Sequence, residues 1–201
     1  MSTFPDKPNV LVLGSGSWGT ALGALLTNNA GKVSVYGKDD KSLDAINTSH
    51  TNPHYLPGVT LPPELRATKD INEATDADLI LFVVPSAATA IVAEQLAALP
   101  LKDDVVLLSC AKGIEKDTGR RMSEIIAAHH PDLRVAVFSG PTHAEEVSRN
   151  LATCAVVGST DDELATALQN LFTTPHFRSY RSDDVAGIEL GGALKNVFAI
   201  A

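Results

Sequence analysis

Short, continuously hydrophobic runs recur along the chain and are separated by segments with the hydrophobic spacing of helices. The run at residues 79–84 has no polar position, which is typical of a parallel strand covered on both faces. The segment 118–129 instead places Met122, Ile125 and Ile126 at helical spacing. This alternation predicts an α/β fold, with a doubly wound, mainly parallel sheet of the Rossmann type.

The same pattern locates the individual elements. We expect strands at residues 9–13, 32–36, 79–84, 105–109, 135–138, 153–157 and 177–180. We expect helices at residues 20–29, 86–99, 118–129, 143–149, 161–171 and 183–201. Four prolines fall within residues 51–63, so this segment is expected to be a loop.

Composition narrows the class of protein. The chain has 201 residues, of which 44% are hydrophobic and 20% charged, and it carries a formal net charge of −8 without a dense Lys/Arg block. Nucleic acid and anionic membranes are therefore disfavoured as partners, and a small molecule is expected. No run reaches the ~18 apolar residues of a membrane helix, and the N-terminus lacks a hydrophobic signal region, so we expect a cytoplasmic protein.

The two cysteines, Cys110 and Cys154, both lie in hydrophobic, strand-like runs. We expect them to be buried and reduced; a disulfide or a reactive thiol is the alternative.

A glycine turn joins the first expected strand to the first expected helix. Gly14, Gly16 and Gly19 form a Gly-x-Gly-x-x-Gly motif. In such a motif the glycines allow a tight turn, the approach of a pyrophosphate to the backbone, and close packing of helix on strand. The free amides of the helix then face the phosphates. We expect this turn to bind a dinucleotide, and a tight turn without a ligand is the alternative.

The end of the second strand bears on the choice of cofactor. NAD-binding proteins usually have an acidic residue there, which bonds to the ribose 2′-hydroxyl. Here Tyr36 is followed by Gly37, Lys38 and Asp39. Lys38 can contact a 2′-phosphate, which favours NADP over NAD. Asp39 keeps NAD open, and Lys38 as a solvated surface residue is the alternative.

Two lysines stand in hydrophobic segments. Lys112 follows the strand 105–109, and ligands bind at the carboxyl ends of strands in open parallel sheets. A lysine is costly to bury unless it is paired or functional, so Lys195 in its hydrophobic helix is a candidate acid–base group. On a helix, Lys195 shares its face with Gly191, Gly192, Phe198 and Ala199. The alternative for both lysines is a solvated side chain.

The segment 139–145 follows another expected strand. Gly140 offers a backbone amide and Thr142 a hydroxyl to a ligand. His143 stands at the start of a helix, where we expect a structural residue rather than a general base. No group of His, Cys, Asp and Glu has the spacing of metal ligands, so no metal is expected.

Six motifs, in order along nearly the whole chain, together resemble the NAD(P)-dependent glycerol-3-phosphate dehydrogenase family. They are GSGSWGTALG (14–23), NPHYLPGVTLP (52–62), VVPS (83–86), AKGIE (111–115), SGPTHAEEV (139–147) and ELGGALKNVFAIA (189–201). The resemblance implies reversible reduction of dihydroxyacetone phosphate by NAD(P)H to sn-glycerol 3-phosphate, a precursor of phospholipids.

The resemblance also implies roles for individual residues. The residues expected to contact the dinucleotide are Gly14, Gly16, Ser17, Trp18, Gly19, Lys38, Lys112 and Ala144. The residues expected to hold the substrate are Lys112, Gly140, Thr142 and Lys195. Lys195 and Lys112 are the catalytic candidates, and Lys195 would be the proton donor in the direction of reduction.

The expected helix 183–201 is hydrophobic on nearly every side, so it requires a larger body around it. We expect residues 1–182 to form a dinucleotide-binding domain and residues 183–201 to be the first helix of an incomplete C-terminal substrate domain. The family resemblance implies that this helical domain supplies an Asp and an Arg to the active site. We therefore expect the 201-residue chain to bind dinucleotide with little turnover, and the full-length form to be a homodimer.

Two other functions remain open. A catalytically silent dinucleotide-binding module would need the glycine turn but not the two lysines in hydrophobic segments. A related dehydrogenase would transfer hydride to or from a different 2-hydroxy acid or sugar acid.

Overall fold

The computed structural model describes residues 3–200, apart from the side chains of residues 196, 198 and 199. Its centre is an eight-stranded sheet with strand order β10-β9-β8-β7-β6-β1-β2-β5. The strands are β1 Val10–Leu13, β2 Val33–Tyr36, β5 Leu65–Thr68, β6 Leu79–Phe82, β7 Val106–Ser109, β8 Arg134–Ser139, β9 Thr153–Gly158 and β10 Phe177–Ser182. Every neighbouring pair is parallel except β8 and β9. The doubly wound, mainly parallel Rossmann-type sheet is confirmed.

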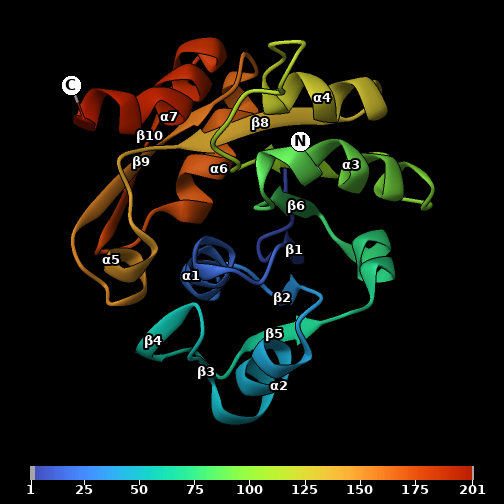
Figure 1. The fold of residues 1–201 in the computed structure, drawn as a ribbon. Coiled ribbons are helices and arrows are strands. Elements are labelled where there is room, and N and C mark those ends of the chain that lie inside the picture. Colours follow the sequence, from blue (N-terminus) through green and yellow to red (C-terminus); the bar gives the residue numbers. More distant parts are fainter. Residues whose placement is uncertain (1–2, 201) are drawn as a thin grey trace.

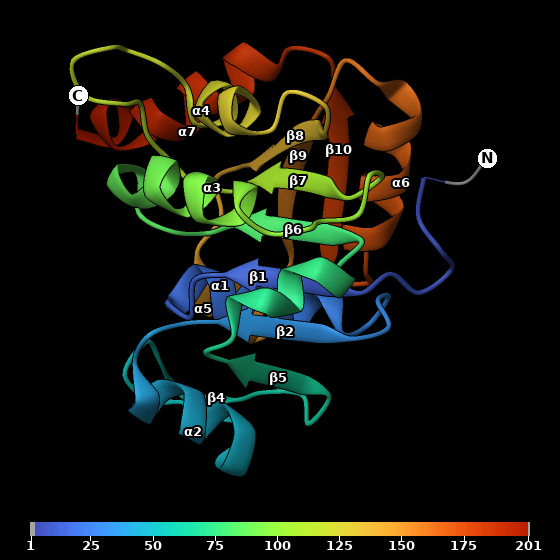
Figure 2. The same ribbon diagram turned by 90° about the vertical axis from the view of Figure 1, so that its right-hand side faces the viewer.

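Helices cover both faces of the sheet (Figures 1 and 2). The helices are α1 Ser17–Leu26, α2 Asp40–Ser49, α3 Thr89–Ala97, α4 Met122–His129, α5 Ala144–Ser148, α6 Asp162–Phe172 and α7 Val185–Ile200, with 3-10 turns η1 Ile71–Asp76 and η2 Ser86–Ala88. Because successive strand residues point to opposite faces, alternate positions of each central strand enter two separate cores. One core packs on α1 and α6, and the other on α3 and α4.

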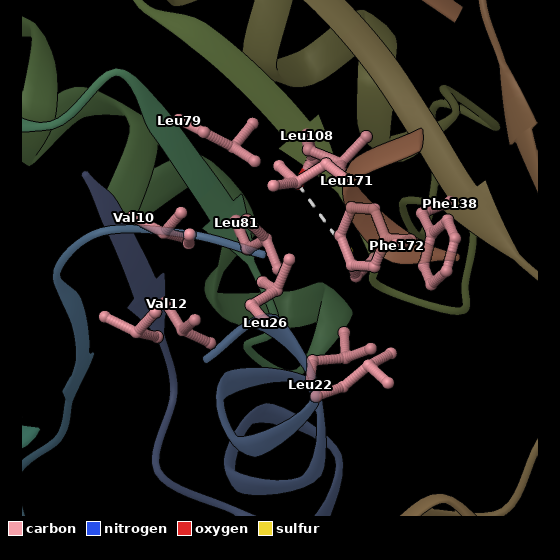
Figure 3. Close-up of a cluster of buried hydrophobic side chains, with 14 of the residues drawn as sticks. Val10, Val12, Leu22, Leu26, Leu79, Leu81, Leu108, Phe138, Leu171 and Phe172 are labelled. Carbon is pink, nitrogen blue, oxygen red and sulfur yellow. Dashed lines mark hydrogen bonds between the residues drawn. The ribbon is translucent and has the colours of Figure 1, made fainter. Parts of the chain in front are cut away.

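The first of these cores joins the two halves of the sheet (Figure 3). Leu22 and Leu26 of α1 and Leu81 of β6 are fully buried in it. Phe172 of α6 stacks on Phe138 of β8 with ring centroids 4.2 Å apart. Burying each such side chain stabilises the fold by about 1.5–3 kcal/mol. The packing fixes α1, and with it the glycine turn, relative to the ends of the central strands.

The expectation of a loop at residues 51–63 is wrong. This segment contains a hairpin formed by β3 (Thr51–Asn52) and β4 (Leu56–Thr60). The hairpin accommodates both prolines. Pro53 lies in the connection between the strands, and Pro57 is exposed on β4. In a two-stranded sheet each strand has one edge without a partner, where a missing N–H group breaks no hydrogen bond. The sequence pattern also missed α2, which is largely polar, and the short edge strand β5.

Several helix boundaries differ from expectation. α1 begins at Ser17, directly after the glycine turn, rather than at residue 20. The region expected to be one helix at 86–99 divides into η2 and α3. The helix expected from residue 118 starts only at Met122, because Gly119 adopts a φ of 74° and residues 114–121 form a separate turn.

The prediction that both cysteines are buried holds only for Cys110; Cys154 is exposed, and neither forms a disulfide. Ala155 takes the inward position on β9, so the preceding Cys154 points to the opposite face. Within residues 3–200, no helix has both the length and the hydrophobicity needed to cross a membrane.

Candidate functional site

A cavity of about 750 Å³ opens at the carboxyl ends of the central parallel strands. Its lining includes the residues that follow these strands: Gly14 after β1, Gly37 after β2, Val83 after β6 and Cys110 after β7. Thr142, beyond the end of β8, closes the far side. Ligands of doubly wound folds bind at this edge of the sheet, so the cavity stands where a cofactor is expected.

The three glycines of the turn have three different structural roles. Gly14 has a φ of 124°, and a Cβ there would lie 2.6 Å from the Val83 carbonyl oxygen. A Cβ at Gly19 would lie 1.8 Å from the Gly14 carbonyl oxygen, so α1 can pack this closely on the turn only without a side chain. At Gly16, by contrast, a Cβ would meet no atom within 4 Å. The backbone at Gly16 therefore borders open space, as a pyrophosphate-binding turn requires.

The first turn of α1 also favours the binding of an anion such as a pyrophosphate. Gly16 is the N-cap, and no side chain caps the helix. The free amides and the positive end of the helix dipole consequently lie beside the cavity, because Ser17 and Trp18 line it. A phosphate group placed there would satisfy these donors.

Lys112 follows the end of β7, and its side chain contacts both Trp18 of α1 and Gly140, which follows β8. Its Nζ atom lies 5.5 Å from the centroid of the Trp18 ring and donates a hydrogen bond to the Gly140 carbonyl oxygen at 3.2 Å. Burial lowers the pKa of Lys112 to about 8, and the Lys195 ammonium contributes in the same direction. Near neutral pH the group therefore carries a partly desolvated charge that readily exchanges a proton.

Lys195 reaches this region because α7 crosses the end of β8. A Cβ at Gly192 would lie 2.3 Å from the Ser139 Oγ atom and 3.9 Å from the Lys112 Cγ atom, so the helix approaches closely at this glycine. Lys195 follows three residues later on the same face and is half-buried. Phe198 and Ala199, the other expected members of this face, have side chains outside the described residues.

A buried carboxylate anchors the same helix. Glu189 of α7 accepts hydrogen bonds from the Ser123 amide at 2.9 Å, from the Ser123 hydroxyl at 2.6 Å and from the Arg121 guanidinium at 3.0 Å. These three donors belong to the start of α4. The contact holds α7 against the start of α4 and so limits sliding of α7 along its own axis. The sequence reasoning did not identify this contact.

Most of the expected site residues come together around the cavity. Its lining includes Gly14, Gly16, Ser17, Trp18, Gly19, Lys38, Lys112, Thr142 and Ala144. Gly140 and Lys195 are outside this lining. The Gly140 carbonyl oxygen accepts a hydrogen bond from Lys112, and Lys195 is close enough to lower the pKa of Lys112. His143 lines the cavity as the N-cap residue of α5. Within the described part of the chain, no three His, Cys, Asp or Glu side chains are grouped as they would be to hold a metal ion.

Tyr55 and Gln95 are among the lining residues that the sequence reasoning missed. Tyr55 belongs to the hairpin that was expected to be a loop. Gln95 follows Val92 and Ala88 at helical spacing, and all three line the cavity. This spacing was the one signal in the sequence that pointed to a contact from α3.

Lys38 and Asp39 differ in how they are engaged. Lys38 is exposed at the rim of the cavity. The Asp39 carboxylate instead caps α2, accepting hydrogen bonds from the Ser42 hydroxyl at 2.5 Å and the Ser42 amide at 3.3 Å. The hydrogen bonds from Ser42 lower the pKa of Asp39. One oxygen of this carboxylate is thus committed to the helix rather than to a ligand.

Residues 9–165 match the model of a family described as the NAD-dependent glycerol-3-phosphate dehydrogenase N-terminus. The chain belongs to this family.

Individual relatives of the glycerol-3-phosphate dehydrogenase family extend the match. The glycerol-3-phosphate dehydrogenase [NAD(P)+] of Enterococcus faecalis is 43% identical over 198 residues, which cover 96% of this chain and 58% of that protein. The enzyme of the same name from an Exiguobacterium species is 45% identical over 197 residues, with the same shares covered. The chain therefore spans about 58% of the length of these curated relatives.

Solved structures show the same relationship. The crystal structure of a glycerol-3-phosphate dehydrogenase from Coxiella burnetii superposes with a TM-score of 0.89 at 32% identity, covering 98% of this chain and 60% of that one. A GDP-mannose dehydrogenase from Pseudomonas aeruginosa superposes with a TM-score of 0.75 at 15% identity over 96% of this chain and 50% of its own, and shares the fold alone.

Proposed function

We propose that the protein acts in the reversible NAD(P)-dependent interconversion of dihydroxyacetone phosphate and sn-glycerol 3-phosphate, and so supplies glycerol 3-phosphate for phospholipid synthesis. The observation that carries the proposal is the position of Lys112, which lies over Trp18 beside the glycine turn and is approached by α7 at Gly192. A silent binding module would not need Lys112 in the lining of its cofactor cavity, with Lys195 close enough to lower the pKa of Lys112. When bound, the cofactor supplies or accepts the hydride.

The glycine turn and the start of α1 hold the cofactor. The open space at Gly16 supports a role in binding the pyrophosphate, and Ser17 and Trp18 follow it along the cavity. Lys38 contacts the ribose 2′-phosphate, which makes NADP the preferred cofactor. Support for this preference comes from Asp39, because Ser42 holds one oxygen of its carboxylate at the start of α2.

Substrate binding falls to the segment after β8 and to the two lysines. The Thr142 Oγ1 atom is buried and has no hydrogen-bond partner in the described part of the chain, so it is available to a phosphate or hydroxyl oxygen. Gly140 lies within hydrogen-bond distance of Lys112. Lys195 stabilises the negative charge that develops on the carbonyl oxygen and then protonates it.

We further propose that residues 1–182 form the dinucleotide-binding domain and that α7 begins the substrate domain. α7 exposes Leu190, Leu194, Val197 and Ile200, by 40%, 40%, 60% and 88%. Such an apolar surface is suited to cover by further protein, and the matched relatives are longer than this chain. We also propose that the protein acts in the cytoplasm, where thiols such as those of Cys110 and Cys154 stay reduced.

The test is a chimaera that joins this chain to the C-terminal segment of the Enterococcus faecalis relative. We expect it to oxidise NADPH when dihydroxyacetone phosphate is added, as measured by absorbance of the reduced cofactor. Lys195→Ala should lower kcat by about 10²–10⁴-fold, as removal of a general acid does, while NADPH binding is retained. The exposed Lys116, changed to Ala, is the control for loss of one positive charge. A folded chimaera without turnover would contradict the proposal.

A further inference from the structure

The β3–β4 hairpin is bonded to the glycine turn through one buried side chain. Asn52 is fully buried, and its Nδ2 atom donates to the Ser15 carbonyl oxygen at 3.0 Å and to the Thr20 hydroxyl at 2.9 Å. The Thr20 hydroxyl in turn donates to the same Ser15 carbonyl oxygen at 3.3 Å. Since a carbonyl oxygen only accepts, the amide nitrogen of Asn52 must face it. The hairpin, the turn and α1 are thus joined at one carbonyl group.

Ser15 is also held from the opposite side of the turn. A Cβ at Gly37, just after β2, would lie 2.1 Å from the Ser15 Oγ atom, so the serine side chain occupies the space left by this glycine. The Gly14 amide donates to the Tyr36 carbonyl oxygen at 2.9 Å. With both its side chain and its carbonyl group fixed, Ser15 has little freedom to rotate.

Fixing the Ser15 carbonyl group also orients the next amide. The peptide unit is planar, and a trans peptide directs its C=O and N–H in opposite directions. No cis peptide bond occurs among the described residues. The Ser15 carbonyl points at Asn52, so the Gly16 N–H points away from the hairpin. Gly16 lines the cavity, and its amide donates to no other group in the described part of the chain.

We propose that Asn52 is a positioning residue for dinucleotide binding, which holds the Ser15–Gly16 peptide so that the Gly16 amide meets the pyrophosphate. The inference rests on the proposed function in one respect: a dinucleotide must occupy the cavity. Glycine-rich segments lose much conformational freedom when they are ordered. By fixing the turn before the ligand arrives, Asn52 removes part of that cost from binding.

The test measures NADPH binding to the 201-residue chain through the emission of Trp18, the single tryptophan, which lines the cavity. Asn52→Ala should raise the Kd for NADPH about tenfold, the effect of losing one to two buried hydrogen bonds. Asn47→Ala is the matched control, because Asn47 also makes two side-chain hydrogen bonds, to Ala67, at a distance from the turn. Its Kd should stay within about twofold of the wild type. Thermal unfolding of each variant confirms that binding is measured on folded protein.

A second pair of variants decides the question should Asn52→Ala fail to fold. Thr20→Val removes the hydroxyl with little change of shape and should raise the Kd for NADPH about threefold. Thr20→Ser keeps the hydroxyl and should bind NADPH with wild-type affinity. The role of Asn52 would be overturned, with the proposed function left standing, by wild-type affinity in Asn52→Ala or Thr20→Val. An equal loss of affinity in Asn47→Ala would have the same consequence. Absence of NADPH binding by the wild-type chain would overturn the proposed function together with this inference.

Discussion

The Lys112 ammonium group lies over the Trp18 ring, 5.5 Å from its centroid. The two residues come from segments more than ninety positions apart, and they meet where the glycine turn faces the end of β7. A cation over an indole face is attracted to its π electrons, so this contact stabilises the charged form of Lys112. Burial acts in the opposite direction and disfavours the charged form. Because the chain has one tryptophan, its tryptophan fluorescence reports on the surroundings of Trp18, which include this contact.

The first prediction concerns pH. Burial lowers the pKa of Lys112 to about 8, so the ammonium is present below that pH and the neutral amine above it. The emission of Trp18 should therefore change with a midpoint near pH 8. Lys112→Met should abolish this transition while leaving the rest of the fluorescence spectrum intact. A transition with the same midpoint in Lys112→Met would mean that another group titrates beside the indole.

The second prediction tests whether the two lysines are close. The Lys195 ammonium helps to lower the pKa of Lys112, so Lys195→Met should move the midpoint of the Trp18 titration to higher pH. Lys116→Met removes the same charge from an exposed position and should leave the midpoint unchanged. Equal midpoints in the wild type and Lys195→Met would place the Lys195 amine too far away to serve the same reacting carbonyl.

The third prediction concerns the cofactor. NADPH and NADH differ in the 2′-phosphate alone, which makes them a matched pair of ligands. If Lys38 binds that phosphate, Lys38→Ala should weaken NADPH binding about tenfold, the effect of losing one charge-assisted contact, and leave the Kd for NADH unchanged. Fluorescence titration at constant salt gives both constants. Equal weakening of the two ligands would show that Lys38 does not read the 2′-phosphate.

The fourth prediction concerns the attachment of α7. Removing the Glu189 carboxylate leaves the Arg121 guanidinium and both Ser123 donors without this acceptor. Glu189→Ala should lower the free energy of unfolding by about 3 kcal/mol, as measured by urea denaturation. Glu124→Ala, which also removes a carboxylate from Arg121 but at an exposed position, should cost about 1 kcal/mol. Similar values for the two variants would show that Glu189 does not anchor the helix.

The sequence predicted the middle strands of the sheet well because they are almost uniformly hydrophobic. β6 and β7 have every residue buried, and such runs leave little choice of structure. The region between residues 40 and 68 was predicted poorly for the opposite reason. α2 is largely polar, and the hairpin is stabilised through Asn52, whose partners Ser15 and Thr20 are more than thirty positions away. A pattern of neighbouring residues does not contain that contact.

The candidate site was predictable where a local motif carries its own geometry. Gly14, Gly16 and Gly19 occupy the positions that the motif requires. The approach of Gly192 to Ser139, by contrast, depends on how α7 packs across the sheet. The same is true of Tyr55, which reaches the cavity only because the hairpin folds back on the turn. These contacts follow from tertiary packing and could not be derived from local spacing.

The most direct test of the central claim, that the glycine turn receives a nicotinamide dinucleotide, is energy transfer from Trp18 to NADPH in the wild type and in Gly16→Ala. A methyl group at Gly16 meets no protein atom, so this variant should unfold at the same temperature as the wild type. It should nevertheless lose the saturable quenching of Trp18, because the methyl group occupies the space of the pyrophosphate. Quenching of equal amplitude and midpoint in both proteins, or none in either, would contradict the account.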